Sequence, residues 1–522
     1  MRKQRSPWTK KQQFIFGIIV IVVTLIASLT AILIVATKPY VDAEKKVIAI
    51  AESKADIKTV TEFDIYHGEA TYYGLLGKSG QGEKLAVIVS HDSGEVDIYK
   101  QSDGISKSVA KKAAKAYGAK ELKWKDYNEM TKLSNRVLQM EESVTLAASA
   151  RAKALKAQGR DILSLTLGEP DFVTPKNIQD AAIASIENGK ASFYTVASGL
   201  PELKDAISTY MKNFYGYAVK PNEVVVGTGA KFILYAFFAT VINPGDEVII
   251  PTPCWVSYVD QVKMVEGVPV TFQTTEANHF KATVEQLEAA RTEKTKVVLL
   301  NSPSNPTGMI YSKEELQAIG DWAVEHDILI LADDIYGRLV YNGNTFTPIS
   351  SLSDAIRKQT IVINGVSKTY AMTGWRVGFA VGDPEIISGM AKIISQTTSN
   401  LTAVSQYAAI EALTGDQSSI EEMRQAFEER LNTIYPLLAE VPGFEVIKPQ
   451  GAFYLFPNVK KAMEIKGYTN VNDFTNAILE EAEVALVTGA GFGAPENIRL
   501  SYATDLDTLK EAVRRIKAFM EK

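Results

Sequence analysis

The sequence predicts an α/β protein with a large, mostly parallel sheet domain and a smaller α+β domain, preceded by a transmembrane helix and a small α+β domain. Three observations support this prediction. Short apolar runs alternate with helical patterns from about residue 166 to about residue 400, which is typical of a parallel sheet covered by helices. The tail after about residue 410 combines long helical patterns with a hairpin-like stretch at Phe444–Pro457. Near the N-terminus, a long apolar run precedes a short segment with strand and turn patterns.

Length and composition limit the function classes. A chain of 522 residues suits two or three domains, and 46% hydrophobic with 22% charged residues is typical of packed cores. The net charge of −5 gives no reason to expect nucleic acid as a partner. The single cysteine, Cys254, excludes an internal disulfide framework. Neither this cysteine nor the four scattered histidines have metal-ligand spacing, so no metal is predicted.

Residues 1–37 have the pattern of a membrane anchor. Residues 1–11 contain five basic residues and no acidic one, and the stretch from Gln12 to Thr37 carries no charge. About 25 residues at ~1.5 Å each exceed the hydrocarbon thickness of a bilayer, whereas a cleaved signal peptide has a shorter apolar core. The basic flank favours a cytoplasmic N-terminus. The sequence therefore predicts a single-pass protein of the cell membrane, with the residues after Thr37 outside.

Residues 38–128 are expected to form a small α+β domain. The patterns predict helices at 42–56 and Ser106–Tyr117, and strands at Thr71–Leu76, Leu85–Ser90 and Val96–Tyr99. This segment resembles the PepSY-like extracytoplasmic domain of TseB-type cell-wall elongation regulators, which follows one membrane anchor. The second helix-plus-strands unit usual in that family lacks its strands here, so the domain is interpreted as truncated.

From Met130 onward the pattern is that of a new pair of domains. We expect a large domain at about 166–410 and a small domain formed by 131–165 together with 411–522. A helix is expected at Leu146–Ala157 and a short strand at Ile162–Leu167. Further strands are expected at Glu223–Val226, Glu247–Ile250, Lys296–Leu300, Ile328–Leu331 and Thr360–Ile363.

One lysine follows the last of these strands. Lys368 lies among small residues just past the apolar run Thr360–Ile363, where burial disfavours the charged form of an amine. Such an amine can form a Schiff base with a carbonyl group. Arg376, eight residues later, can supply a fixed cation for a phosphate. Alone this pattern is weak, because a lysine and an arginine in a surface loop would look the same.

Three motifs in a fixed order strengthen the interpretation. Asn-Pro-Thr-Gly occupies residues 305–308, Asp333 is followed by Tyr336 at the end of another strand, and the Ser-Lys pair comes next, with Arg376 after it. This order resembles that of the class I aminotransferases, fold-type I enzymes that use pyridoxal 5'-phosphate, and most closely the aspartate aminotransferase branch. The resemblance covers roughly Met130 to Lys522, so residues 130–522 are expected to form a class I aminotransferase.

The resemblance implies how the cofactor ring is held. Lys368 is the amine that forms the Schiff base, and Asp333 keeps the pyridine nitrogen protonated. Tyr336 and Asn305 donate hydrogen bonds to the ring oxygen, and Trp255 stacks on the ring. Lys368, Asp333 and Tyr336 are therefore the expected catalytic residues.

The resemblance also implies a phosphate cradle. Gly229 and Ala230 lie in a small-residue turn between a strand and a helix, where free backbone amides can face a phosphate. Arg376 supplies the permanent countercharge. Tyr194 matches a tyrosine that reaches the phosphate of the neighbouring subunit, which implies a homodimer with shared active sites.

Several positions are expected to bind the amino acid and 2-oxo acid substrates. Arg499 matches the arginine that holds the α-carboxylate, since its planar fork suits two parallel bonds. Gly168 matches a glycine whose backbone lies against the substrate. Lys231 and Ser143 match the lysine and the nearby hydroxyl that meet a side-chain carboxylate. The expected substrate-binding set is Gly168, Trp255, Asn305, Arg499, Lys231 and Ser143.

We therefore expect transamination by a ping-pong cycle, in which L-aspartate leaves as oxaloacetate and 2-oxoglutarate leaves as L-glutamate. An aromatic or prephenate aminotransferase is the first alternative. An aromatic-specific enzyme would not need Lys231, whereas prephenate carries a side-chain carboxylate. The second alternative is a membrane-anchored cell-wall regulator with a catalytically idle passenger domain, against which the complete set of cofactor residues argues.

Two expectations about location conflict. A single anchor places the rest of the chain outside the membrane, whereas an aminotransferase is expected to work in the cytoplasm, where its cofactor and 2-oxo acids are supplied. No second apolar run of about 20 residues lies between Thr37 and Met130. The truncated domain and the start-like sequence at Met130 suggest a fusion of two reading frames. In this hypothesis the active enzyme is chiefly a soluble cytoplasmic form that begins near Met130.

Overall fold

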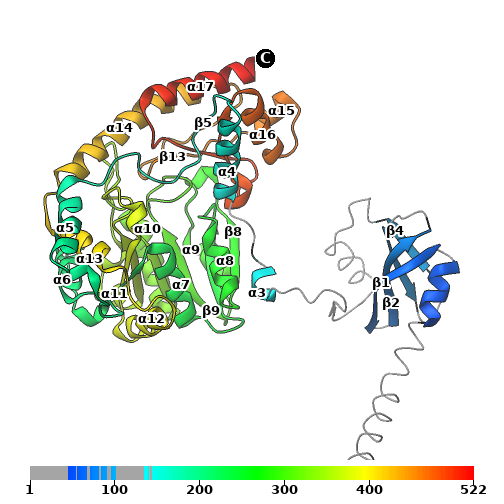
Figure 1. Cartoon of the computed structure of the whole chain (residues 1–522), viewed down its shortest axis with the longest axis horizontal. Coiled ribbons are helices and arrows are strands. Elements are labelled where there is room, and N and C mark those ends of the chain that lie inside the picture. Colours follow the sequence, from blue (N-terminus) through cyan, green and yellow to red (C-terminus); the bar gives the residue numbers. More distant parts are fainter. Residues whose placement is uncertain are drawn as a thin grey trace, which may run out of the picture. The chain divides into compact units, whose positions relative to one another are not determined.

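A computed structural model of the chain describes residues 45–53, 56–67, 71–80, 84–90, 96–100, 134–138, 140 and 144–522. The chain divides into two compact units, Met1–Ser134 and Asn135–Lys522. Figure 1 shows the elements of both units.

The first unit contains a four-stranded antiparallel sheet and a helix at residues 45–53. The strand order follows the sequence, with β1 (Ile57–His67), β2 (Thr71–Ser79), β3 (Lys84–Ser90) and β4 (Val96–Lys100). The three strands predicted from the sequence are confirmed as β2, β3 and β4, and β1 was not predicted. The helix predicted at Ser106–Tyr117 lies outside the described residues. The buried core joins the helix to the sheet through Val47, Ala51, Ile57, Leu75, Leu85 and Val87.

A seven-stranded sheet forms the centre of the second unit. Its order is β6-β12-β11-β10-β9-β7-β8, and every neighbouring pair is parallel except the two pairs that contain β12. The five strands predicted for this region are confirmed, whereas β8 and β12 were not predicted. The bounds are Val224–Thr228 (β6), Glu247–Thr252 (β7), Val268–Gln273 (β8), Thr295–Asn301 (β9), Leu329–Asp333 (β10), Thr360–Gly365 (β11) and Val377–Val381 (β12).

Alternate residues of each central strand pack on opposite faces of this sheet, as the period of two requires. Leu331 and Ile361 face a core formed with α7 (Ala230–Val241), α8 (Ser257–Met264) and α12 (Pro384–Thr397). Their neighbours Ile330 and Val362 face the other side. That side is covered by α5 (Lys176–Glu187), α6 (Pro201–Tyr210), α9 (Val284–Ala290), α10 (Lys313–Glu325), α11 (Asp354–Gln359) and α13 (Ala403–Thr414).

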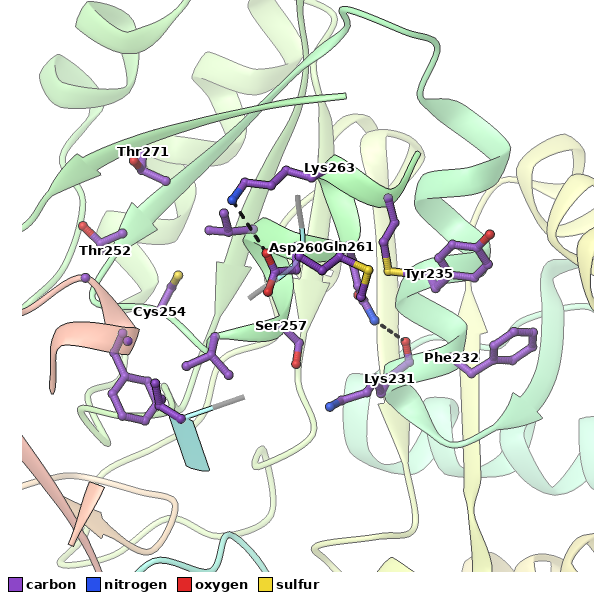
Figure 2. A pocket seen from close by; sticks show the side chains of 18 of the residues that line it. Lys231, Phe232, Tyr235, Thr252, Cys254, Ser257, Asp260, Gln261, Lys263 and Thr271 are labelled. Carbon is purple, nitrogen blue, oxygen red and sulfur yellow. Dashed lines mark hydrogen bonds and ion pairs between the residues drawn. The ribbon is translucent and has the colours of Figure 1, made fainter. Parts of the chain in front are cut away.

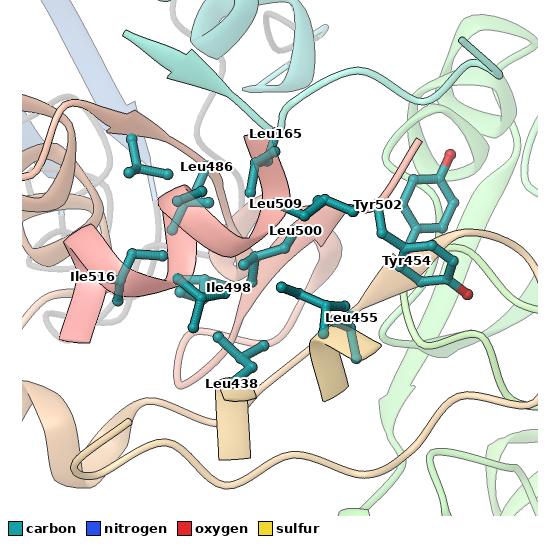
Figure 3. Packing of buried hydrophobic residues seen from close by; sticks show 14 of the residues in the cluster. Leu165, Leu438, Tyr454, Leu455, Leu486, Ile498, Leu500, Tyr502, Leu509 and Ile516 are labelled. Carbon is teal, nitrogen blue, oxygen red and sulfur yellow. The ribbon is translucent and has the colours of Figure 1, made fainter. Parts of the chain in front are cut away.

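Residues from both ends of the second unit build a separate core. Leu165, Leu438, Leu500, Leu509 and many neighbours form one buried cluster, in which Figure 3 shows side chains of β16 and α17 meeting. A three-stranded sheet of order β13-β16-β15 lies in this cluster, and β5 pairs in parallel with β14. The elements of this region are α4 (Val144–Ala157), β5 (Leu163–Ser164), α14 (Ser418–Ala439), β13 (Tyr454–Leu455), α15 (Lys460–Lys466), α16 (Val471–Glu481), β14 (Val484–Ala485), β15 (Val487–Thr488), β16 (Ile498–Ser501) and α17 (Leu506–Glu521). The short helix α3 (Asn135–Leu138) contacts α8 instead.

Two short extended segments of this region differ in detail from their predictions. The strand predicted at Ile162–Leu167 is shorter, because β5 pairs with β14 only at Leu163–Ser164 before the chain turns into the cavity described below. The hairpin-like stretch Phe444–Pro457 is closed by an isolated antiparallel bridge between Glu445 and Asn458. The division into domains at about residues 166 and 410 stays a prediction.

The single-pass membrane location predicted from the sequence is corrected here. Among the described residues, no helix is both long enough and apolar enough to cross a membrane. The most extended of the helices named above, α14, spans 22 residues but carries several charged side chains, and the apolar α7 has only 12 residues where about 20 are needed. The apolar run Gln12–Thr37, on which the prediction rested, lies outside the described residues.

The core around Phe427 gives a stability prediction. Phe427 is fully buried, and its ring stacks on Phe453 at 5.3 Å and meets Phe172 edge-on at 5.6 Å. We expect Phe427→Ala to lower the free energy of unfolding by about 3–5 kcal/mol, because it removes apolar contacts and leaves a cavity. Urea unfolding measures this loss. The control Gln425→Ala, exposed on the same helix, should change stability by less than about 0.5 kcal/mol, and equal losses would contradict the packing argument.

Candidate active site

A cavity of about 340 Å³ lies beside the carboxyl ends of the parallel strands, where ligands of open α/β sheets commonly bind. Its lining combines residues that follow β9, β10 and β11 with residues from the helical core around β13 and β16. Most of the predicted site residues meet here. Those that line the cavity are Gly168, Ala230, Lys231, Trp255, Asn305, Asp333, Tyr336, Lys368, Arg376 and Arg499.

Lys368 lies partly buried in this cavity, in the connection between β11 and β12. Its Nζ donates a hydrogen bond to the carbonyl oxygen of Gly168. Burial lowers the pKa of Lys368 to about 8; Glu169 opposes this effect, and Arg376 and Arg499 add to it. This shift raises the fraction of neutral amine near neutral pH above that of an ordinary lysine, and a nucleophilic lysine must be neutral.

Asp333 ends β10 and is 3% exposed. Its carboxylate accepts a hydrogen bond of 2.7 Å from the Tyr258 hydroxyl and one of 3.3 Å from the backbone N–H of Ile335. Burial raises the pKa of Asp333 to about 6, while these two hydrogen bonds and Lys368 act in the opposite direction. A buried carboxylate of this kind is suited to pair with a protonated ring nitrogen.

Asn301 joins two parts of the site and was not predicted from the sequence. Its side chain donates to the carbonyl oxygen of Asp333 at 2.8 Å and accepts from the backbone N–H of Asn305 at 2.8 Å. Asn301 and Asp333 are also partners in the parallel register of β9 and β10. The polar turn after β9 is therefore tied to the end of β10.

The turn between β6 and α7 is shaped for close approach of an anion. Gly229 has φ = +82°, and a Cβ there would lie 2.4 Å from Nη2 of Arg376. Gly378 on β12 packs against the same turn, where its Cβ would lie 2.3 Å from the amide nitrogen of Ala230. The free amides at the start of α7, together with the guanidinium of Arg376, can therefore hold a phosphate.

Arg499 on β16 is a deeply buried cation, 1% exposed. Its Nη1 donates to Oδ1 of Asn305 and its Nη2 to the carbonyl oxygen of Thr166, both at 2.9 Å. Its Cζ lies 4.5 Å from the ring centroid of Tyr454 and 5.0 Å from that of Phe492. Within the described residues Nε has no hydrogen-bond partner and no carboxylate pairs with the guanidinium. A buried cation of this kind is suited to bind an anionic ligand.

Lys231 lies in the first turn of α7, at the rim of the same cavity. Its Nζ lies 4.8 Å from the ring centroid of Trp255. Desolvation and the charge of Arg376 both lower the pKa of Lys231. The side chain of Gln261 donates to the backbone carbonyl of Lys231 at 2.8 Å, as the dashed line in Figure 2 shows. Lys231 and Arg376 also line a second, neighbouring cavity of about 840 Å³.

Three predicted residues do not line the cavity. Gly229 acts through the turn already described, and Ser143 lies outside the described residues. Tyr194 is 92% exposed, on the connection between α5 and α6. Its hydroxyl is therefore available to another molecule and not to this chain's own cavity.

Sequence reasoning missed several cavity residues besides Asn301, among them Tyr258, Thr145 and Tyr454. Tyr258 follows Trp255 by three residues, a spacing that could have indicated a shared face. Thr145 is the second residue of α4, and its hydroxyl is buried without a hydrogen-bond partner among the described residues. Tyr454 comes from β13 and had no signal in the sequence around it. The arrangement as a whole fits pyridoxal 5'-phosphate, since it supplies an amine, a buried carboxylate, a phosphate cradle and an aromatic face.

Comparison with known proteins identifies the family. The family model described as "Aminotransferase class I and II" matches residues 160–516, so the chain belongs to the class I and II aminotransferases. It is therefore a pyridoxal-phosphate-dependent transaminase, as the sequence predicted. A second family model, "Cell wall elongation regulator TseB-like domain", matches residues 47–90, which supports the resemblance stated for the N-terminal unit.

Similar proteins cover the second unit. The chain is 77% identical over 393 residues to the "Asparagine--oxo-acid transaminase" of Streptococcus mutans, covering 75% of this chain and 100% of that protein. It is 52% identical to the "Aspartate aminotransferase" of Bacillus subtilis, covering 75% and 99%. The solved aspartate aminotransferase of Thermus thermophilus with maleate has a TM-score of 0.71 and 37% identity, covering 74% and 100%.

The Tyr258–Asp333 hydrogen bond gives a pH prediction. This bond lowers the pKa of Asp333, so its loss in Tyr258→Phe should raise that pKa. Asp333 would then become protonated at a higher pH, and the acid limb of the kcat/KM profile should move to higher pH. Tyr311→Phe is the control, because Tyr311 is also buried but its hydroxyl accepts from the backbone N–H of Ala282. If the acid limb of Tyr258→Phe stays in place or moves to lower pH, the proposed effect of Tyr258 on the pKa of Asp333 is wrong.

Proposed function

We propose that the protein is an aspartate transaminase, which passes the amino group of L-aspartate to 2-oxoglutarate in a ping-pong cycle. The observation that carries this proposal is that two cationic side chains, Arg499 and Lys231, line the cavity around Lys368. Among the described residues no acidic side chain pairs with the buried Arg499. Lys231 lies at the rim of the same cavity. A dicarboxylic amino acid matches that charge pattern at both of its ends.

The chain's own residues have separable roles in this proposal. Pyridoxal phosphate, when bound, supplies the electron sink that lets the substrate Cα lose its proton. Asp333, with Tyr258 behind it, holds the ring nitrogen in its protonated form, and Tyr336 and Asn305 donate to the ring oxygen. Lys368 accepts and returns the Cα proton, which its lowered pKa permits near neutral pH.

The remaining contacts fix the cofactor and the substrate in place. Gly229 and Ala230 give the phosphate its backbone amides, and Arg376 gives it a countercharge. Trp255 covers one face of the ring. Arg499 holds the α-carboxylate. The backbone of Gly168, whose carbonyl oxygen accepts a hydrogen bond from Lys368, lies against the substrate.

The side-chain carboxylate of the substrate is bound by Lys231, Thr145 and, as the sequence predicts, Ser143. The buried Thr145 hydroxyl, which has no hydrogen-bond partner in the described part of the chain, supports this assignment, because a ligand oxygen can recover the free energy that such a group costs. An amino acid with an uncharged aromatic side chain would leave Lys231 without an anion. Prephenate would offer a side-chain carboxylate to Lys231, so a prephenate aminotransferase stays the alternative.

L-asparagine is a second candidate donor, favoured by the 77% identity to an asparagine–oxo-acid transaminase. A neutral side-chain amide could accept a hydrogen bond from Lys231 through its oxygen and donate one to Thr145. The same residues can therefore serve aspartate and asparagine.

The active unit is proposed to be a homodimer. Tyr194 is almost fully exposed, and the apolar side chains of Phe193 (76% exposed), Val196 (58%) and Val173 (82%) are exposed as well. Exposed apolar side chains that gather into a patch mark interaction surfaces. In a dimer, Tyr194 would reach the phosphate of the partner's site, where a hydroxyl donor is useful.

Lys231→Ala tests the substrate assignment. We expect KM for aspartate to rise roughly 10- to 150-fold, which corresponds to the loss of one charge-assisted hydrogen bond of about 1.5–3 kcal/mol. KM for phenylalanine should change little, and KM for asparagine by an intermediate factor. Steady-state assays with 2-oxoglutarate as acceptor measure these values. Lys263→Ala is the matched control, because Lys263 lines only the neighbouring cavity and pairs with Asp260. Equal losses for aspartate and phenylalanine would contradict the assignment.

A mixture of two inactive variants tests the shared site. Lys368→Ala should abolish activity, and Tyr194→Ala should weaken cofactor binding and lower activity strongly. After the two are unfolded and refolded together, half of the dimers are mixed and each has one intact site, so about a quarter of wild-type activity should return. Analytical ultracentrifugation checks that dimers form. Full activity in Tyr194→Ala, or no recovery on mixing, would overturn the dimer proposal.

A further inference from the structure

We propose that Tyr454 is a positioning residue for the cofactor-binding tyrosine, to which it donates a hydrogen bond so that the proton of Tyr336 is directed at the ring oxygen. The inference rests on the proposed role of Tyr336 and adds a residue that acts through it. Tyr454 itself is assigned no contact with the cofactor.

The two hydroxyl groups are in direct contact inside the protein. They lie 2.9 Å apart, both side chains are buried, and either oxygen could be the donor. The rings meet edge-on, with centroids 5.9 Å apart and an interplanar angle of 82°. The ring of Phe453 packs against Tyr454 at 4.8 Å and against Tyr336 at 5.5 Å, so the pair has little freedom to separate.

A count of protons gives the direction of this hydrogen bond when the cofactor is bound. Each tyrosine hydroxyl has one proton to donate and two lone pairs to accept with. If Tyr336 directs its proton at the ring oxygen, the contact between the two tyrosines can only use the proton of Tyr454. A hydroxyl that accepts one hydrogen bond becomes a stronger donor of another, so Tyr454 strengthens the bond that Tyr336 makes.

Tyr454 is held in place by regular structure and by its neighbours. It lies on β13, paired with Ser501 of β16, two residues after Arg499. Its hydroxyl also occupies the space beside Gly168, where a Cβ would come within 2.6 Å of it. Gly168 is therefore required to be small on account of Tyr454, which the sequence could not indicate.

Burial keeps Tyr454 in its neutral, donating form. Burial raises the pKa of the Tyr454 hydroxyl; Arg499 and the bond with Tyr336 lower it, and Glu169 raises it. Burial also raises the pKa of Tyr336 well above its usual value, so both groups retain their protons at neutral pH. The guanidinium of Arg499 lies 4.5 Å from the centroid of the Tyr454 ring, which gives the ring a second contact independent of the hydroxyl.

Substitutions separate the two contacts of Tyr454. Tyr454→Phe removes the hydroxyl but leaves the ring below Arg499, whereas Tyr454→Leu removes both. In the cofactor-loaded protein, the visible absorbance changes with pH, and its midpoint reports how well the anion on the ring oxygen is stabilised. We expect Tyr454→Phe to move this midpoint to higher pH by roughly 0.3–0.7 unit, less than Tyr336→Phe does, because the donor is weakened and not lost.

The double variant and the Michaelis constants complete the test. Tyr336→Phe combined with Tyr454→Phe should show the midpoint of Tyr336→Phe alone, since Tyr454 acts only through Tyr336. KM for aspartate should stay within about twofold in Tyr454→Phe and rise in Tyr454→Leu, where the ring contact with Arg499 is lost. Tyr502→Phe is the matched control, because Tyr502 is equally buried in the same core but bonds to the carbonyl of Ala452 at 3.2 Å (Figure 3).

The outcomes distinguish this inference from the proposed function. If Tyr336→Phe moves the midpoint and Tyr454→Phe does not, the coupling is wrong and the cofactor role of Tyr336 stands. Additive shifts in the double variant would also overturn the coupling, since they would require Tyr454 to act independently. If neither variant moves the midpoint, both the coupling and the role of Tyr336 are overturned.

Discussion

The register between β9, β10 and β11 is the constraint on which the rest of the site depends. Asp333 pairs with Asn301 on one side and with Ile363 on the other, and Lys368 follows β11 after a short turn. A slip of one residue would turn the carboxylate to the opposite face of the sheet and separate it from Tyr258. The apolar alternation that packs helices on both faces of the sheet therefore also fixes the position of the chemistry.

Substrate binding also requires a cation at this edge of the sheet, and the cation comes from the separate core around β16. Arg499 comes from β16, held in the three-stranded sheet by β13 and β15, and reaches Asn305 of the polar turn. Its aromatic neighbours Tyr454 and Phe492 cover the guanidinium without neutralising it. Substrate binding therefore depends on how the residues around β16 meet the large sheet, and a change in either core alters the distance between Arg499 and Lys368.

Much of this arrangement could be predicted from the sequence, for a physical reason. Strands with continuous apolar runs, and the polar residues just after them, are local signals, so β7, β9, β10 and β11 with Asp333 and Lys368 were found. Contacts between distant segments leave no such signal. Tyr454 and Thr145 lie far in the sequence from the motifs they adjoin. The membrane location was wrong as a prediction, because it rested on one apolar run and not on any described helix.

The antiparallel strand β12 has a consequence for how the site forms. Lys368 and Arg376 both lie in the short connection between β11 and β12, which pair directly with each other. Their spacing is therefore set by a local hairpin, whereas β12 reaches β6 and the phosphate turn across well over a hundred residues. Local contacts cost little loop-closure entropy and form early in folding. The amine and its neighbouring cation are thus expected to be organised before the backbone amides that complete the anion cradle, so assembly of β6 against β12 is the folding step that makes the chain competent to bind its cofactor.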